Sequence, residues 1–233
     1  METLARAMAD FAEEMQMTRG LAQIATVAAE TASRLIPGVE QASVSLARRG
    51  VGIDTLAADA QLPWAVDAVQ VATGQGPCIQ AAWQDRVALL QDTATDESWP
   101  EFCRQARQLG VGSMLSLQLS LDEADDQGIG AINTYARTPH AFTQQSVDVG
   151  MILAVHASVG VTRAQQDAQL RQALASRDLI GQAKGMLMAQ HGMSADTAFD
   201  VLVRQSRDTN TRLRDVAASI VMGAEDREAV SPN

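Results

Sequence analysis

Lys184 is the only lysine in a chain that has seventeen arginines, and its neighbours are spaced as on a helix surface. At 100° per residue, Lys184 shares a stripe with Arg177, Gly181 and Met188, at the edge of an apolar face. Gly181 and Gly185 each cost about 1 kcal/mol relative to alanine inside a helix. Keeping both glycines therefore predicts close approach by another surface. That surface is either a second helix or a nucleic-acid backbone that Lys184 would contact.

A second group of polar residues lies about twenty positions downstream. It comprises Arg204, Arg207, Arg212 and Arg214, with Asn210 and Thr211 among them. Guanidinium groups bind phosphates, and the short polar side chains can hydrogen-bond bases or phosphates. The same residues also suit a helix cap and a solvated surface, so the pattern alone leaves both interpretations open.

The other side chains with chemical potential are three histidines and two cysteines: His140, His156, His191, Cys78 and Cys103. None of the histidines is spaced with a cysteine or carboxylate as metal ligands are. No phosphate-binding loop with its lysine and no nucleophile-elbow motif occurs. The cysteines fall in different predicted elements, and free cysteines are often simply buried apolar residues. We therefore predict no catalytic residue, no metal, no resident cofactor and no enzyme activity.

Charge is distributed unevenly along the chain, whose net charge is −10. Residues 171–222 hold seven basic and five acidic side chains, whereas the remainder holds eleven basic and twenty-three acidic ones. The C-terminal quarter is therefore a different kind of surface from the rest. No uninterrupted apolar run reaches the roughly 18 residues of a membrane span, and the N-terminus does not resemble a secretion signal. We expect a cytoplasmic protein with no membrane partner.

The first 160 residues predict an α+β domain. We expect a helix over 3–36 that Gly20 divides, a hairpin over 41–59 turning at 49–50, two short helices over 62–85, a strand at 86–92, a helix over 96–110, and two strands joined by an acidic turn at 122–127. Neighbouring hairpins with helices between them favour an antiparallel sheet covered by helices on one face.

The C-terminal part predicts helices throughout, beginning near Thr143. The predicted division is a domain over 1–160, a helical connector over 161–175, a three-helix module over 176–222 and a disordered tail over 223–233. A seven-residue stripe along 147–168 fits either a coiled coil or the closing helix of the first domain. In the module, Ser194 is a good N-cap, Phe199 falls on the apolar core face with Leu202, and Gly223 is expected to end the last helix.

Residues 176–221 resemble an ANTAR domain along all three helices. The most specific matches are IxxAKGxLM at 180–188, AFxxL at 198–202 and NxxLxxVA at 210–217. The resemblance implies an RNA-binding antiterminator that works as a dimer on a leader RNA with two small hairpins. It implies RNA contact by Lys184, Asn210, Arg212 and Arg214, with Arg177 and Arg207 as further candidates.

The first 160 residues resemble a GAF domain of the kind joined to ANTAR domains in actinobacteria. The matching segments are GQGPCIQA at 74–81, SWPEFCRQARQLGVGSMLSLQL at 98–119 and GAINTYARTPHAF at 130–142. This resemblance implies a sensor of an unspecified small molecule or a scaffold for dimerisation.

Together these observations predict a cytoplasmic, homodimeric transcription regulator that binds leader RNA under the control of its first domain. Two alternatives stay open. Three short helices can also form a DNA-binding helix-turn-helix. A GAF-type redox enzyme, such as a methionine sulfoxide reductase, would need Cys78 and Cys103 as nucleophilic and resolving thiols, and neither has a visible activating neighbour.

Overall fold

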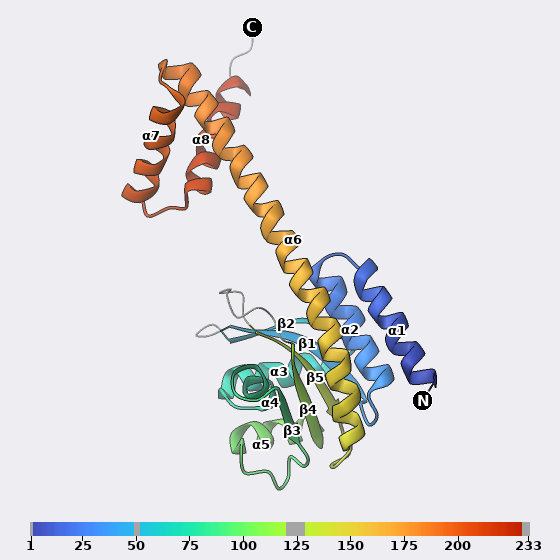
Figure 1. Ribbon diagram of the computed structural model, residues 1–233. Helices are drawn as coiled ribbons and strands as arrows, with labels where there is room; N and C mark the ends of the chain where they lie inside the picture. Colours follow the sequence, from blue (N-terminus) through green and yellow to red (C-terminus); the bar gives the residue numbers. More distant parts are fainter. Residues whose placement is uncertain (1, 49–51, 120–128, 230–233) are drawn as a thin grey trace. The chain divides into compact units, whose positions relative to one another are not determined.

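The computed structural model describes residues 2–48, 52–119 and 129–229, in two compact units that divide between Gln165 and Gln166 (Figure 1). The predicted hairpin turn at 49–50 and the predicted acidic turn at 122–127 lie outside the described residues.

Unit 1, residues 1–165, is built on a five-stranded antiparallel sheet with strand order β2-β1-β5-β4-β3. The strands are β1 (Gln41–Arg48), β2 (Gly52–Ala58), β3 (Val87–Leu90), β4 (Ser113–Leu119) and β5 (Ile129–Ala136). The hairpin pairs Ser45 with Thr55 and Leu46 with Asp54, and a register shift lies between Val44 and Ser45. The predicted α+β class and both predicted hairpins are confirmed.

Helices cover both faces of this sheet, so the expectation of one covered face is wrong. One face packs against α1 (Glu2–Met17), α2 (Leu21–Leu35) and the first part of α6 (Gln144–His191), around a core that includes Phe11, Ile24 and Leu153. The other face packs against α3 (Gln61–Thr73), α4 (Pro77–Trp83) and α5 (Pro100–Gln108), around Phe102 and Tyr135. Figure 1 shows the two helical layers. The sheet is buried on both sides because its strands carry small or apolar side chains in both directions.

Local signals fix the helix ends as the sequence predicts. Gly20 separates α1 from α2, and Pro77 and Pro100 occupy the first turns of α4 and α5. Gly74 ends α3 in the left-handed conformation with a φ of 63°. Arg163 of α6 then ties the end of α1 in place, because its guanidinium donates to the carbonyl oxygens of Met15 at 3.0 Å and Thr18 at 2.6 Å.

The predicted seven-residue stripe on α6 faces the core of its own unit over much of its length. Ala154, Ser158 and Val161 are buried there, as the closing-helix interpretation expects. Among the described residues, α6 is the one helix long and apolar enough to cross a membrane by length and composition. Half of that apolar window is buried inside the protein, as expected for a core helix.

Unit 2, residues 166–233, comprises the second part of α6, α7 (Ala195–Asp208) and α8 (Leu213–Ala229). Its core is formed by small and aliphatic side chains from the three helices: Ala183, Leu187, Ala198, Leu202, Val216 and Ala217. Ser194 is the N-cap of α7 as predicted, since its hydroxyl accepts from the Thr197 amide at 3.2 Å. The predicted end of the last helix at Gly223 is wrong, because α8 continues to Ala229.

Candidate nucleic-acid interface

Lys184 lies half-buried on α6, with its ammonium group over the ring of Phe199 from α7. The Nζ atom is 5.7 Å from the ring centroid, within the range of a cation–π contact. Phe199 is 39% exposed and is not part of the unit 2 core. The prediction that Phe199 falls on the core face is therefore wrong. It lies on the flank of α7, about 60° around the helix from the buried Leu202.

Gly181 and Gly185 lie in open space on the same helix as Lys184. A methyl group added at either position would meet nothing within 4 Å. Neither glycine is therefore required by packing against another described part of the chain. Their cost of about 1 kcal/mol each in a helix has no compensation inside the fold. The bare backbone beside Lys184 is accessible to a partner.

The turn between α7 and α8 holds the second group of predicted residues. Asn210 adopts the left-handed conformation with a φ of 50°, which asparagine tolerates better than most residues. The Arg212 carbonyl accepts from the amides of Asp215 at 2.8 Å and Val216 at 3.1 Å, at the start of α8. Arg214 pairs with its neighbour Asp215 at 3.3 Å, which offsets part of its charge. Arg207 lies in the last turn of α7.

The structure thus separates the predicted RNA-binding residues into two groups. Arg177 and Lys184 are on α6, whereas Arg207, Asn210, Arg212 and Arg214 surround the α7–α8 turn. Within the described residues, no side-chain hydrogen bond or ion pair is found for Arg177, Arg207, Asn210 or Arg212, and all four are exposed. Their polar groups are free to contact a ligand.

Unit 1 contains a polar cluster that the sequence did not reveal, centred on the buried carboxylate of Asp67 in α3. Its Oδ2 accepts hydrogen bonds from Ser43 at 3.1 Å, Ser45 at 2.8 Å and Thr55 at 2.9 Å. Its Oδ1 accepts from Tyr135 at 2.6 Å, Gln70 at 3.1 Å and Asn133 at 3.5 Å. The signal in the sequence was an aspartate inside the apolar helix QLPWAVDAVQVAT.

Burial controls the protonation of this cluster. Desolvation raises the pKa of Asp67, and the hydrogen bonds from Tyr135, Ser45, Thr55 and Ser43 oppose that rise. Desolvation also raises the pKa of Tyr135 well above its ordinary value, with the charge of Asp67 adding to the effect. The cluster consists of groups that satisfy one another rather than groups facing solvent.

The cysteines are both free and buried, in the layer between the sheet and α3, α4 and α5. Desolvation and then the charge of Asp67 raise the pKa of the Cys78 thiol. Desolvation, with smaller effects of Asp96 and Asp92, raises the pKa of Cys103 to about 11. Both side chains are therefore thiols at neutral pH, whereas nucleophilic cysteines are activated by a lowered pKa.

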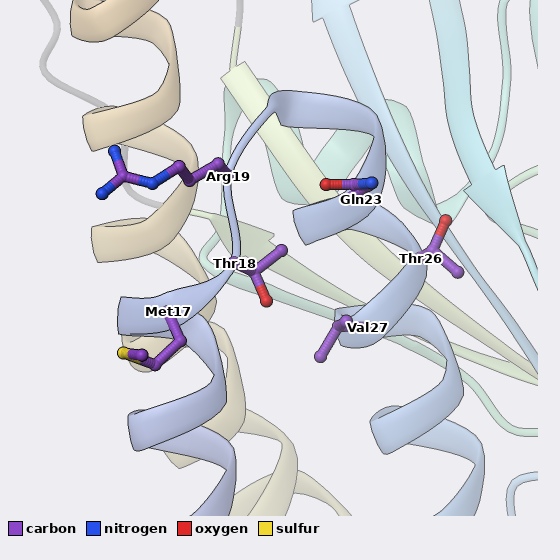
Figure 2. A pocket seen from close by; sticks show the side chains of 6 residues that line it. All are labelled: Met17, Thr18, Arg19, Gln23, Thr26 and Val27. Carbon is purple, nitrogen blue, oxygen red and sulfur yellow. The ribbon is translucent and has the colours of Figure 1, made fainter.

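Neither a metal site nor a built ligand pocket is found among the described residues. The described residues contain no group of three or more His, Cys, Asp or Glu side chains that could hold a metal ion. An open depression of about 520 Å³ lies at the turn between α1 and α2. Figure 2 shows the side chains that line it. The hydroxyls of Thr18 and Thr26 in its wall already donate to helix carbonyls, at 2.8 Å and 3.0 Å.

Comparison with known families matches both parts of the chain. The family model for the ANTAR domain matches residues 168–221, and a GAF domain model matches residues 2–162. No curated protein matches the sequence.

Solved structures support the fold of the first part. Bacteriophytochrome RpBphP3 from R. palustris is 13% identical, with a TM-score of 0.56 over 80% of this chain and 42% of that one. Its chromophore-binding domain is 12% identical, with a TM-score of 0.53 over 71% of this chain and 63% of that one. The GAF domain of an Acinetobacter phosphoenolpyruvate-protein phosphotransferase is 14% identical, with a TM-score of 0.56 over 71% of this chain and 96% of that one. The chain spans less than two thirds of either R. palustris structure. At these identities the likeness shows the fold alone.

Proposed function

This chain belongs to the GAF domain family and carries a C-terminal ANTAR domain, and from this we propose that it is a cytoplasmic regulator that prevents transcription termination by binding leader RNA. The observation that carries the proposal is the ANTAR match over 168–221, which covers all three helices of unit 2. GAF and ANTAR domains are regulatory rather than catalytic. The raised pKa values of Cys78 and Cys103 are consistent with that class.

The proposed RNA contact uses Lys184, Asn210, Arg212 and Arg214, supported by Arg177 and Arg207. Arg177, Arg207 and Arg212 are exposed and have no ion-pair partner among the described residues, so they can bind phosphates without first breaking an internal interaction, whereas Arg214 would have to leave Asp215. Such contacts release counterions, so we expect affinity to fall steeply as salt rises. The RNA we propose is a leader with two small hairpins.

We propose further that the protein acts as a homodimer. Leu170 and Leu174 of unit 2 are 61% and 51% exposed and lie four residues apart on α6, on the side that carries Gly181. Val155 and Val159 of unit 1 are 64% and 65% exposed at the same spacing. Exposed aliphatic pairs at helical spacing suit pairing with a second copy. Two linked modules bind two hairpins far more tightly than one.

Unit 1 is proposed to sense a signal or to scaffold the dimer. Its Asp67 cluster fills part of the layer between the sheet and α3 with the protein's own hydrogen bonds. This supports the scaffold role, since a small molecule binding there would have to replace those bonds. A sensor ligand would raise the thermal unfolding temperature of the full chain.

The test is a selection by the full-length protein from a pool of two-hairpin RNAs with randomised loops. We expect the wild type to enrich defined loop sequences. Lys184→Ala should bind the enriched RNA at least tenfold more weakly, and the slope of affinity against salt should fall by roughly 0.7–0.9. Thermal unfolding should change little, because a cation–π contact at the surface contributes about 0.5–1 kcal/mol.

The matched control is Arg171→Ala, which removes an exposed cation from the same helix outside the predicted contact. It should leave binding nearly unchanged. Preference for duplex DNA over the enriched RNA at equal salt would instead support a helix-turn-helix regulator. Unchanged RNA binding by Lys184→Ala would show that its assigned role is wrong.

A further inference from the structure

Phe199 is the only aromatic side chain of the Phe, Tyr and Trp type in residues 166–233, and it lies outside the core of its unit. A small helical module gains most from an aromatic residue when the ring is buried, because the ring removes a large apolar area from water. Here aliphatic and alanine side chains form the core, while the one ring is 39% exposed. Core packing therefore does not explain the position of Phe199.

The exposed ring is held next to the residue most expected to contact RNA. The Lys184 Nζ lies 5.7 Å from the ring centroid, so the ammonium group covers one face of the ring. A cation–π contact at an exposed site is weak, and a phosphate competes well for the same ammonium group. When Lys184 turns to a phosphate, the ring face becomes available to a flat apolar group.

We propose that Phe199 is a stacking platform for an unpaired base of the RNA loop, uncovered when the Lys184 ammonium moves from the ring to a phosphate. This rests on the proposed RNA-binding function and adds a contact that the charged residues do not provide. Bases in single-stranded loops are recognised largely by stacking on aromatic side chains. The contact tolerates different bases, since each has a π face.

The charges around the ring favour a base there over a phosphate. Asp196 lies one turn before Phe199 on the same side of α7, and Asp200 follows Phe199 directly. These carboxylates repel phosphate from the ring, whereas an uncharged base is unaffected. The sugar-phosphate backbone is instead drawn to Lys184 and to the arginines of the α7–α8 turn.

Affinity measurements on the full chain with the selected two-hairpin RNA separate stacking from charge. Phe199→Leu should weaken binding about five- to hundredfold, the range found for base–aromatic stacking, with the slope against salt unchanged. Phe199→Tyr should restore binding. The control is Val201→Ala, at a residue of similar exposure, 37%, on the opposite flank of α7, and it should bind as the wild type does.

The single lysine gives a direct readout of the exchange. Lysine-selective ¹³C labelling at the ε carbon of the full chain yields the signal of Lys184 alone, whose ε-methylene protons should be shifted by the Phe199 ring current. That shift should disappear in Phe199→Leu, and in the wild type it should change on addition of RNA. A loop 5-iodouridine should crosslink to Phe199.

The outcomes are distinguishable. If the wild type fails to enrich any RNA, the proposed function fails, and this proposal with it. If the wild type binds RNA and folded Phe199→Leu binds equally well, the stacking proposal is overturned while the proposed function stands. A loss of binding with a reduced salt slope would also overturn it, by showing that Phe199 acts only by positioning Lys184.

Discussion

The two units treat their polar side chains in opposite ways. In unit 1, the carboxylate of Asp67 is buried and accepts hydrogen bonds from side chains of four separate elements. In unit 2, the guanidinium groups of Arg177, Arg207 and Arg212 are exposed, with no ion pair among the described residues. Polar groups that satisfy each other hold a fold together. Polar groups left without internal partners are available to bind something else.

The largest effect is expected at Asp67. Asp67→Ala leaves several buried hydroxyls without their shared acceptor and opens a small cavity. We expect it to lower the free energy of unfolding of unit 1 by about 3–5 kcal/mol. Guanidinium denaturation followed by tryptophan fluorescence measures this selectively, because Trp64, Trp83 and Trp99 all lie in unit 1.

The control for this change is Asp54→Ala, an exposed aspartate on β2 of the same unit. It should change the free energy of unfolding by less than about 0.5 kcal/mol. Equal effects of the two substitutions would mean that the Asp67 cluster contributes little to stability.

The stability of unit 1 is expected to depend on pH through Asp67. Burial raises the pKa of Asp67 above 3.8, so between the unfolded and folded values the native state binds more protons than the unfolded state. The contribution of Asp67 to stability must therefore fall as pH rises from about 4 through its folded pKa, by about 1.4 kcal/mol per unit of pKa elevation. Asp67→Asn lacks this titration.

The measurement is the difference in free energy of unfolding between the wild type and Asp67→Asn at several pH values from 4 to 8. The subtraction removes the contributions of the titrating groups that the two proteins share. We expect the wild type to lose stability relative to Asp67→Asn as pH rises. The opposite trend would show that the hydrogen bonds outweigh desolvation and lower the pKa.

The sequence predicted what is encoded locally. Pro77, Pro100 and Gly74 mark helix ends because their effects on the backbone need no distant partner. Alternation predicted the hairpins for the same reason. The Asp67 cluster could not be predicted, because Ser43, Thr55 and Tyr135 come from three different strands and only the folded sheet places them around one carboxylate.

In the candidate interface, too, some features could be predicted from the sequence and others could not. The family resemblance named Lys184 and the arginines, but helical projection placed Phe199 in the core. A helical projection gives the direction in which a side chain leaves its own helix. It does not show whether a neighbouring helix covers that side chain. The prediction that Gly223 ends the last helix is wrong for a related reason: a glycine caps a helix where the chain turns into the left-handed conformation, and α8 instead continues through Gly223 to Ala229.

The smallest effect is expected at Gly181 and Gly185, where the helix is less stable than it would be with alanine but its backbone beside Lys184 is open. Replacing Gly181 and Gly185 with alanine adds methyl groups that meet nothing within 4 Å. We therefore expect each substitution to stabilise unit 2 by up to about 1 kcal/mol. Hydrogen exchange of the amides of residues 176–221 in the full chain reports this, because unit 2 has no tryptophan.

If the glycines keep the backbone beside Lys184 open to RNA or to a second copy, the double variant should be more stable yet bind the selected RNA more weakly. A variant that gains stability and binds equally well would leave these glycines without a role in binding. A variant that loses stability would mean that they pack closely against the chain itself, contrary to the structure.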